Sequence, residues 1–210
     1  QAAISRTASD VYKRQADAEL PDPTTSAIWS SANLGQFAGP SWTVRLAMNP
    51  FTGNLQRVNR RLQRQLAAQQ SLPRRAEVRQ VLADQTAYDA SPYNSSSSGG
   101  VRNFIEGWVG DAALHNRVHV WVGGDMQWSS SPNDPAFFLH HCNVDRIWAA
   151  WQERYPAASY LPDMSAPAAL QFHRIDDALY SVFEETVTPR QVIDYRTSYE
   201  YDSLADLMGS

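Results

Sequence analysis

The sequence has one cysteine, no long apolar run and no excess of basic charge, and each shortage excludes a class of protein. The single Cys142 among 210 residues cannot form an intrachain disulfide, so nothing indicates an oxidising compartment. No apolar run approaches the roughly 20 residues that a transmembrane helix needs, so we expect no membrane partner. The formal net charge of -4 gives no reason to expect a nucleic-acid partner.

The remaining composition indicates one folded domain. A content of 43% hydrophobic and 19% charged residues is typical of a globular chain, and 210 residues suffice for a real core. Residues 1–15 fit no pattern, and we expect a disordered or non-native tail there. Residues 16–54 are rich in Pro, Gly, Ser, Thr and Asn, which predicts a long loop with short strands near 41–47. Residues 55–70 are dense in Arg and Gln, which predicts a helix with a solvated basic face formed by Arg57, Arg60, Arg61 and Arg64.

Histidine is concentrated in one stretch. Four of the five histidines lie between positions 115 and 141. His115 and His119 are four residues apart, so a helix over 114–121 would place both rings on one face. Gly123 and Gly124 would end this helix, because glycine readily adopts the left-handed conformation found after helix C-termini.

A second helix is predicted from about residue 135 to about residue 154. Asn133 or Asp134 is a suitable N-cap, and Pro135 suits the first helical position. On this helix Phe138, His141, Val144 or Asp145, and Trp148 share one stripe. Packing this stripe against the first helix would bring His141 to the other pair, while His140 would point about 100° away, on the flank.

Three neutral imidazoles without clustered thiolates or carboxylates suit copper or zinc. The alternative interpretation is that these are surface or core histidines without a ligand. One pair at this spacing would not decide the question, but two adjacent helices that hold four of the five histidines favour a metal site.

The residues around these histidines resemble a known family. HNRVHVWVGG followed by NDPAFFLHHCNVDRIWAAWQ is similar to the second copper half, CuB, of bacterial-type tyrosinases, which are type 3 copper proteins. Asp134-Pro135-x-Phe137, then His141 and then Asp145 match the family signature. The resemblance implies a mainly α, helical type 3 copper bundle with long loops and a few short strands. Residues 16–210 would form a partial domain of this kind, with the CuB half at 101–155.

The resemblance also implies a role for individual residues. His115, His119 and His141 would bind the CuB ion. Glu106 and Asn116 would position a catalytic water that deprotonates a phenol. Asp145, one helical turn after His141, is a candidate either to support the ligands from behind or to form an ion pair with Arg146 or Arg117. Three further residues would line the substrate cavity: His140, Trp128 and Val120.

The implied activity is the oxidation of phenols and o-diphenols to o-quinones with O2, and it needs two copper ions with three histidines each. No histidine precedes His115, and only His173, expected to face solvent, lies outside the cluster. We therefore expect an N-terminally truncated tyrosinase that binds one copper ion and is inactive alone. The alternatives are a mononuclear copper-binding or O2-binding module completed by a partner chain, and a vestigial structural domain.

Several partners follow from this interpretation. They are a phenol or catechol substrate, O2, and a copper-delivery caddie protein. An apolar face exposed by the missing helices would favour self-association. The sequence does not indicate the compartment: we expect a soluble protein that is either cytoplasmic or secreted together with a partner.

Overall fold

The computed structural model describes residues 18–35, 42–49, 51–179 and 186–209, and this part of the chain is mainly helical. The α-helices are α2 (Arg75–Asp84), α3 (Val101–Glu106), α4 (Asn116–Val122), α5 (Ala136–Arg154), α6 (Pro189–Val192) and α7 (Ala205–Met208). Short 3-10 turns are η1 (Pro23–Thr25), η2 (Ala27–Trp29), η3 (Gly124–Gln127), η4 (Ser131–Asn133), η5 (Ala168–Leu170) and η6 (Tyr195–Thr197). The strands are β1 (Thr43–Met48) and β2 (Leu55–Arg61). The mainly α fold predicted from the sequence is confirmed.

Helix α5 is the longest element, with 19 residues, and it organises the main core. Its buried face presents Ile147, Ala150 and Trp151 to side chains from the neighbouring helices. These neighbours are Val78, Val81 and Leu82 from α2, Val101 and Ile105 from α3, and Leu207 from α7. Each large apolar side chain buried in this way contributes about 1.5–3 kcal/mol. The packing fixes the axis of α5 and therefore the positions of the histidines near its start.

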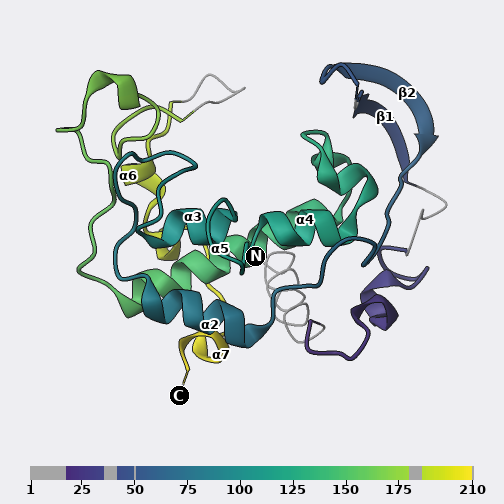
Figure 1. Ribbon diagram of the computed structural model, residues 1–210, viewed down its shortest axis with the longest axis horizontal. Coiled ribbons are helices and arrows are strands. Elements are labelled where there is room, and N and C mark those ends of the chain that lie inside the picture. The colour runs from purple at the N-terminus through teal and green to yellow at the C-terminus, as the bar shows by residue number, and fades with distance from the viewer. Residues whose placement is uncertain (1–17, 36–41, 50, 180–185, 210) are drawn as a thin grey trace.

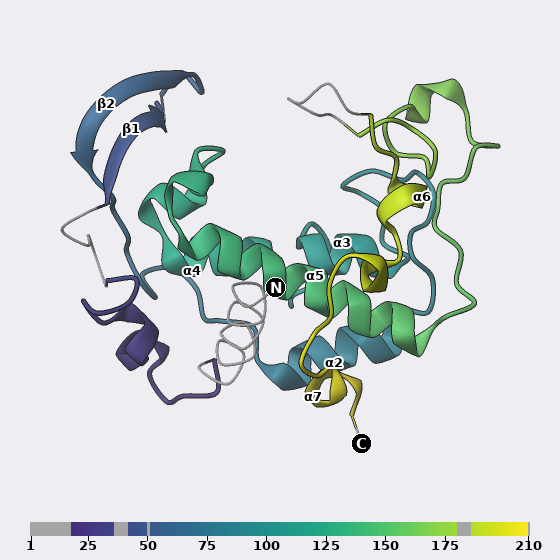
Figure 2. The same cartoon turned by 180° about the vertical axis from the view of Figure 1, so that it is seen from behind.

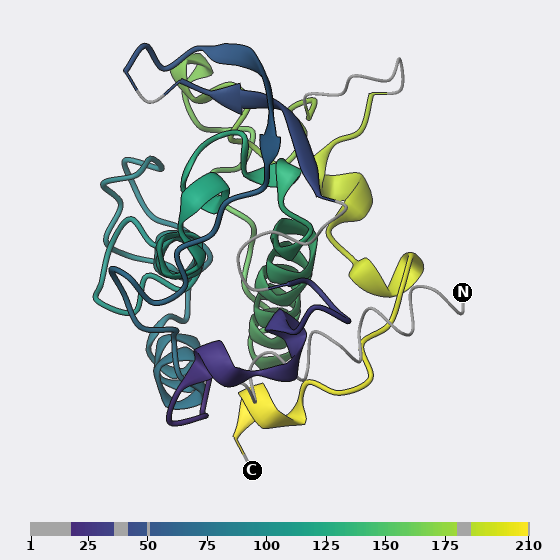
Figure 3. The same ribbon diagram turned by 90° about the vertical axis from the view of Figure 1, so that its right-hand side faces the viewer.

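A second apolar cluster holds the end of α4 against the start of α5. Trp121, Val122 and Met126 pack with Trp29 and Ala136. Figure 1 shows α4 and α5 in the middle of the molecule, with the β1–β2 hairpin beyond one side and α6 on the other. Figure 2 shows the same arrangement from behind, and Figure 3 shows the hairpin and α7 at opposite ends.

The predicted stop of the first histidine helix is confirmed, and the structure gives a second reason for it. Gly123 and Gly124, which both have a positive φ, follow α4 directly. A Cβ on Gly124 would lie 2.2 Å from the carbonyl oxygen of Gln63. The segment after β2 therefore runs against the end of α4, where the amide of Gln65 donates to the carbonyl of Val122 at 2.9 Å.

The helix predicted over residues 55–70 is wrong. Residues 55–61 form β2, which pairs antiparallel with β1 so that Thr43 lies opposite Arg61 and Met48 opposite Leu55. The expected solvated basic face is also wrong in part, because Arg64 is only 3% exposed and Arg60 forms an ion pair with the buried Asp125. Pairing with a strand from an earlier part of the chain overrides the local preference for helix here. The short strand expected near 41–47 is confirmed.

The expected tail at residues 1–15 lies outside the described residues. Within the described part of the chain, no helix combines the length and apolar character needed to cross a membrane.

Candidate metal centre

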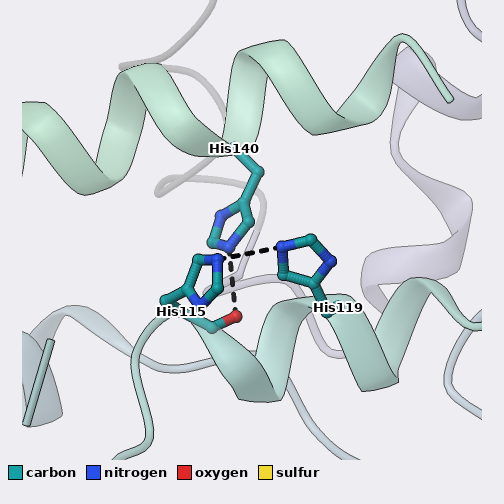
Figure 4. A group of neighbouring side chains, drawn as sticks. All are labelled: His115, His119 and His140. Atoms are coloured by element: carbon teal, nitrogen blue, oxygen red, sulfur yellow. Dashed lines mark hydrogen bonds between the residues drawn. The ribbon is translucent and has the colours of Figure 1, made fainter. Parts of the chain in front are cut away.

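Four histidines from α4 and α5 meet at one place. His115 stands at the N-cap of α4, and His119 follows one helical turn later. His140 and His141 occupy the second turn of α5, where the helix passes over α4. Figure 4 shows His115 and His119 pointing up from α4 and His140 pointing down toward them from α5. His173, the remaining histidine, is exposed, as expected.

Three ring nitrogens face one another within this cluster. The Nε2 atoms of His115 and His119 are 3.0 Å apart, and each lies 3.3 Å from Nε2 of His141. Three nitrogens bound to one tetrahedral ion at about 2.0–2.1 Å would be separated by about 3.3 Å. The spacing therefore fits a single ion held between the three rings.

The partners of the outer ring nitrogens indicate the tautomers of His115 and His119. Nδ1 of His119 lies 2.6 Å from the carbonyl oxygen of Met126. Nδ1 of His115 lies 3.2 Å from the carbonyl oxygen of Glu106 and 3.0 Å from Oδ1 of Asn116. A carbonyl oxygen only accepts, so we assign the proton of both rings to Nδ1. Their Nε2 lone pairs then face each other, an arrangement that a bound cation stabilises.

Burial favours the neutral form of His119, His140 and His141, and neutral rings are what metal binding requires. Desolvation lowers the pKa of His119 and lowers the pKa of His141 to about 4. Desolvation also lowers the pKa of His140 well below the ordinary histidine value. Neutral imidazole is the form that binds copper or zinc.

Two sets of three histidines could hold an ion, and they differ in their third member. Nitrogens of His115, His119 and His140 lie within 4.8 Å of one another. The set that contains His141 is tighter, with all three Nε2 atoms within 3.3 Å. Nε2 of His140 instead lies 3.1 Å from the carbonyl oxygen of His115, to which it donates. We favour the set with His141 because its nitrogens have no competing carbonyl. His140 packs on His115 and does not stand on the flank as expected.

Phe137 is the aromatic neighbour of the cluster. Its ring stacks on His141 with centroids 3.9 Å apart and lies edge-on to His119 at 6.1 Å. Phe138, which we expected on the inward stripe, is 57% exposed. The Asp-Pro-x-Phe motif singles out Phe137 in the sequence, but the motif does not say which side chains its ring contacts.

Asn116 and Glu106 lie on the outer side of His115. Both reach its Nδ1, Asn116 through its side chain and Glu106 through its backbone carbonyl. The Glu106 carboxylate is 43% exposed and accepts from Nη1 of Arg102 at 3.0 Å. Arg102 also pairs with Asp89 at 2.6 Å, so an ion-pair network fixes this carboxylate.

The expected ion pair of Asp145 is wrong. Its carboxylate accepts hydrogen bonds from the hydroxyl groups of Tyr199 and Tyr201. Arg146 pairs with Asp206, and Arg117 pairs with Glu77. Asp145 therefore ties the C-terminal segment to α5, a role that depends on tyrosines more than 50 positions away.

The residues expected around a substrate cavity do not all share one pocket. His140 lines an apolar pocket together with Trp29, Leu114 and Val118. Trp128 is 43% exposed and lines a different hollow, between the β1–β2 hairpin and η3. Val120 is half-buried on α4. The cavity roles of these residues stay predictions.

Much of the sequence is shared with known proteins. Residues 4–154 match the family model described as the common central domain of tyrosinase. The chain belongs to the tyrosinase family. It is 43% identical over 188 residues to a tyrosinase of Streptomyces antibioticus, an alignment that covers 85% of this chain and 66% of that protein. A tyrosinase of Streptomyces glaucescens is 42% identical over 187 residues, which cover 85% of this chain and 65% of that protein.

A more distant relative is unit D of the hemocyanin beta-C chain from Helix pomatia. It is 36% identical over 121 residues, which are 49% of this chain and 28% of that protein. The chain thus spans about two-thirds of the length of the bacterial tyrosinases and a smaller share of the hemocyanin unit.

Proposed function

We propose that this chain is the CuB-binding part of a tyrosinase-type copper oxidase, in which His115, His119 and His141 bind one copper ion. The observation that carries the proposal is the convergence of their Nε2 atoms within 3.3 Å. Copper in a complete site of this family supplies the redox chemistry by which O2 oxidises phenols and o-diphenols to o-quinones.

The residues of this chain have three tasks in that function. The carbonyls of Glu106 and Met126 orient the rings of His115 and His119 so that both present a lone pair. Phe137 stacks on His141 and shields one face of the site from water. Glu106 and Asn116, which both lie against His115, would hold the water that takes the proton of an incoming phenol.

The histidine count limits what the chain does alone. The three proposed ligands and His140 leave only the exposed His173, so a second site of three histidines cannot be built from one copy. We propose that the isolated chain binds one copper ion and oxidises phenols or catechols slowly or not at all. A second copper-binding half with three further histidines would complete the oxidase, and a copper-delivery protein would load it.

The test is the ratio of copper to chain in the purified, copper-loaded protein, measured by element-resolved mass spectrometry. We expect a ratio near one that His119→Ala abolishes. The matched control is His173→Ala, which removes the histidine outside the cluster and should leave the ratio unchanged. A ratio near zero in the unaltered chain contradicts the proposed copper site, and the chain is then a structural domain.

Catechol oxidation by the same preparations tests the second part of the proposal. A rate equal to that of full-length tyrosinases, or a ratio near two, contradicts a half-site and indicates that a second copy or further ligands complete the pair. Retained copper with no oxidation leaves a half-site, and adding a chain that supplies three further histidines should then restore activity.

A further inference from the structure

One backbone oxygen, the carbonyl of His115, connects three of the four histidines of the centre. The carbonyl of His115 accepts from the amides of Val118 at 3.1 Å and His119 at 3.4 Å. It also accepts from Nε2 of His140 at 3.1 Å, the contact drawn vertically in Figure 4. This oxygen belongs to the first proposed ligand, His115, and accepts a hydrogen bond from the amide of the second, His119. Its third partner, His140, precedes the remaining ligand, His141, in the sequence.

The ring of His140 is held firmly in this position. The residue is only 4% exposed. Its ring stacks nearly parallel on the ring of His115, with centroids 5.2 Å apart and an interplanar angle of 15°. It lies edge-on to His119 at the same centroid distance. Because α5 is anchored in the main core, His140 transmits the position of α5 to the first turn of α4.

We propose that His140 is a positioning residue of the copper site, which holds His115 and the start of α4 by donating its Nε2–H to the carbonyl of His115. The inference rests on the proposed copper site at His115, His119 and His141. His140 itself contributes no bond to the ion, because its Nε2 proton is committed to the carbonyl. Without this contact, α4 can rotate and shift the nitrogens of His115 and His119 relative to His141.

Two substitutions separate the hydrogen bond from the ring. His140→Gln keeps an N–H donor near the position of Nε2, whereas His140→Leu fills the space without a donor. We expect His140→Leu to weaken Cu(II) binding about 10- to 100-fold, the usual effect of losing a group that orients a ligand. His140→Gln should bind close to the wild-type value. Competition with a chelator gives the dissociation constants, and thermal unfolding without copper reports whether each variant folds.

A control for general loosening of this region is Ile147→Ala. Ile147 is buried on the same helix and lines the same apolar pocket as His140. This variant should lower the unfolding temperature but weaken copper binding much less than His140→Leu does, because it leaves the hydrogen bond from His140 to the carbonyl of His115 intact. A loss of affinity equal to that of His140→Leu would mean that packing alone positions α4, and would overturn the proposal.

Electron spin echo spectroscopy of the Cu(II) protein gives an independent readout, because it counts bound imidazoles. We expect three imidazoles in the wild type and in His140→Gln. Four in the wild type and three in the variant would make His140 a ligand and overturn the proposal. Equal affinity of His140→Leu and wild type would also overturn it. If His140→Leu fails to fold, His140→Met, which likewise lacks an N–H donor, takes its place in the comparison. Failure of the wild type to bind copper at all is a different result, since it removes the proposed function first.

Discussion

The ion pair between Arg64 and Asp134 should be the most sensitive electrostatic contact in the described part of the chain. Both side chains have 0% exposure, and Nε and Nη2 of Arg64 each lie 2.7 Å from a carboxylate oxygen of Asp134. The same carboxylate accepts from the amide of Ala136 at 2.8 Å, at the start of α5. Asp134 therefore joins the segment after β2 to the helix that carries His141.

Asp134→Ala would leave the guanidinium of Arg64 buried without a counter-charge. Removing one partner of a buried pair costs about 3–5 kcal/mol. With a urea dependence of about 2 kcal/mol per molar, the unfolding midpoint should fall by about 1.5–2.5 M. The matched control is Asp176→Ala, which breaks the exposed pair with Arg190 and should leave the urea midpoint almost unchanged, because water screens this pair.

The reasoning is refuted if the urea midpoints of Asp134→Ala and Asp176→Ala fall by the same amount. A double variant, Arg64→Met with Asp134→Leu, adds a second check. Replacing both charges by apolar groups removes the unpaired cation, so this variant should be more stable than Asp134→Ala. If it is less stable, the cost comes from lost packing and not from the unpaired charge.

Three further predictions concern the core, the centre and pH. Leu82→Ala, at a site with 0% exposure, should lower the free energy of unfolding by about 2–5 kcal/mol. Leu46→Ala, at a site with 45% exposure, should lower the thermal midpoint far less than Leu82→Ala does. Equal losses in the two variants would contradict the assigned core. Asn116→Ala removes an acceptor of the His115 Nδ1 proton and should weaken copper binding about tenfold, measured by chelator competition; an unchanged constant would show that the Glu106 carbonyl suffices. The metal-free chain should be most stable above about pH 6.5 and lose stability as the pH falls toward 4. Burial lowers the pKa of His141 in the folded chain to about 4, so in this pH range the unfolded chain binds more protons than the folded chain. Urea midpoints that do not change between pH 7 and pH 5 would contradict this assignment.

The long histidine-bearing helix was accessible from local sequence. The Asn-Asp-Pro start and the apolar pattern that follows predicted a helix from about residue 135 to 154, and α5 spans Ala136–Arg154. The Gly123–Gly124 stop of α4 was equally local. These features succeed because caps and helical pitch act over a few residues, so neighbouring positions contain the whole signal.

The segment after residue 54 shows where local reasoning fails. Its Arg and Gln residues favour a helix, yet residues 55–61 form a strand because β1 supplies the hydrogen-bond partners. Arg64 is buried because Asp134 lies beside it, 70 positions later in the chain. Asp145 likewise receives tyrosine hydroxyls and no arginine. Composition cannot report partners that only the folded chain brings together.

Local sequence was enough to predict that His115 and His119 share one helical face and that His141 lies near the start of a second helix, because the helical period fixes which side chains point the same way. It could not predict that the three Nε2 atoms meet within 3.3 Å or that His140 donates to the carbonyl of His115. Those distances depend on the crossing of α4 and α5, which is set by core side chains distributed over the whole chain. Helical pitch is a property of neighbours, whereas the crossing of two helices is a property of the packed core.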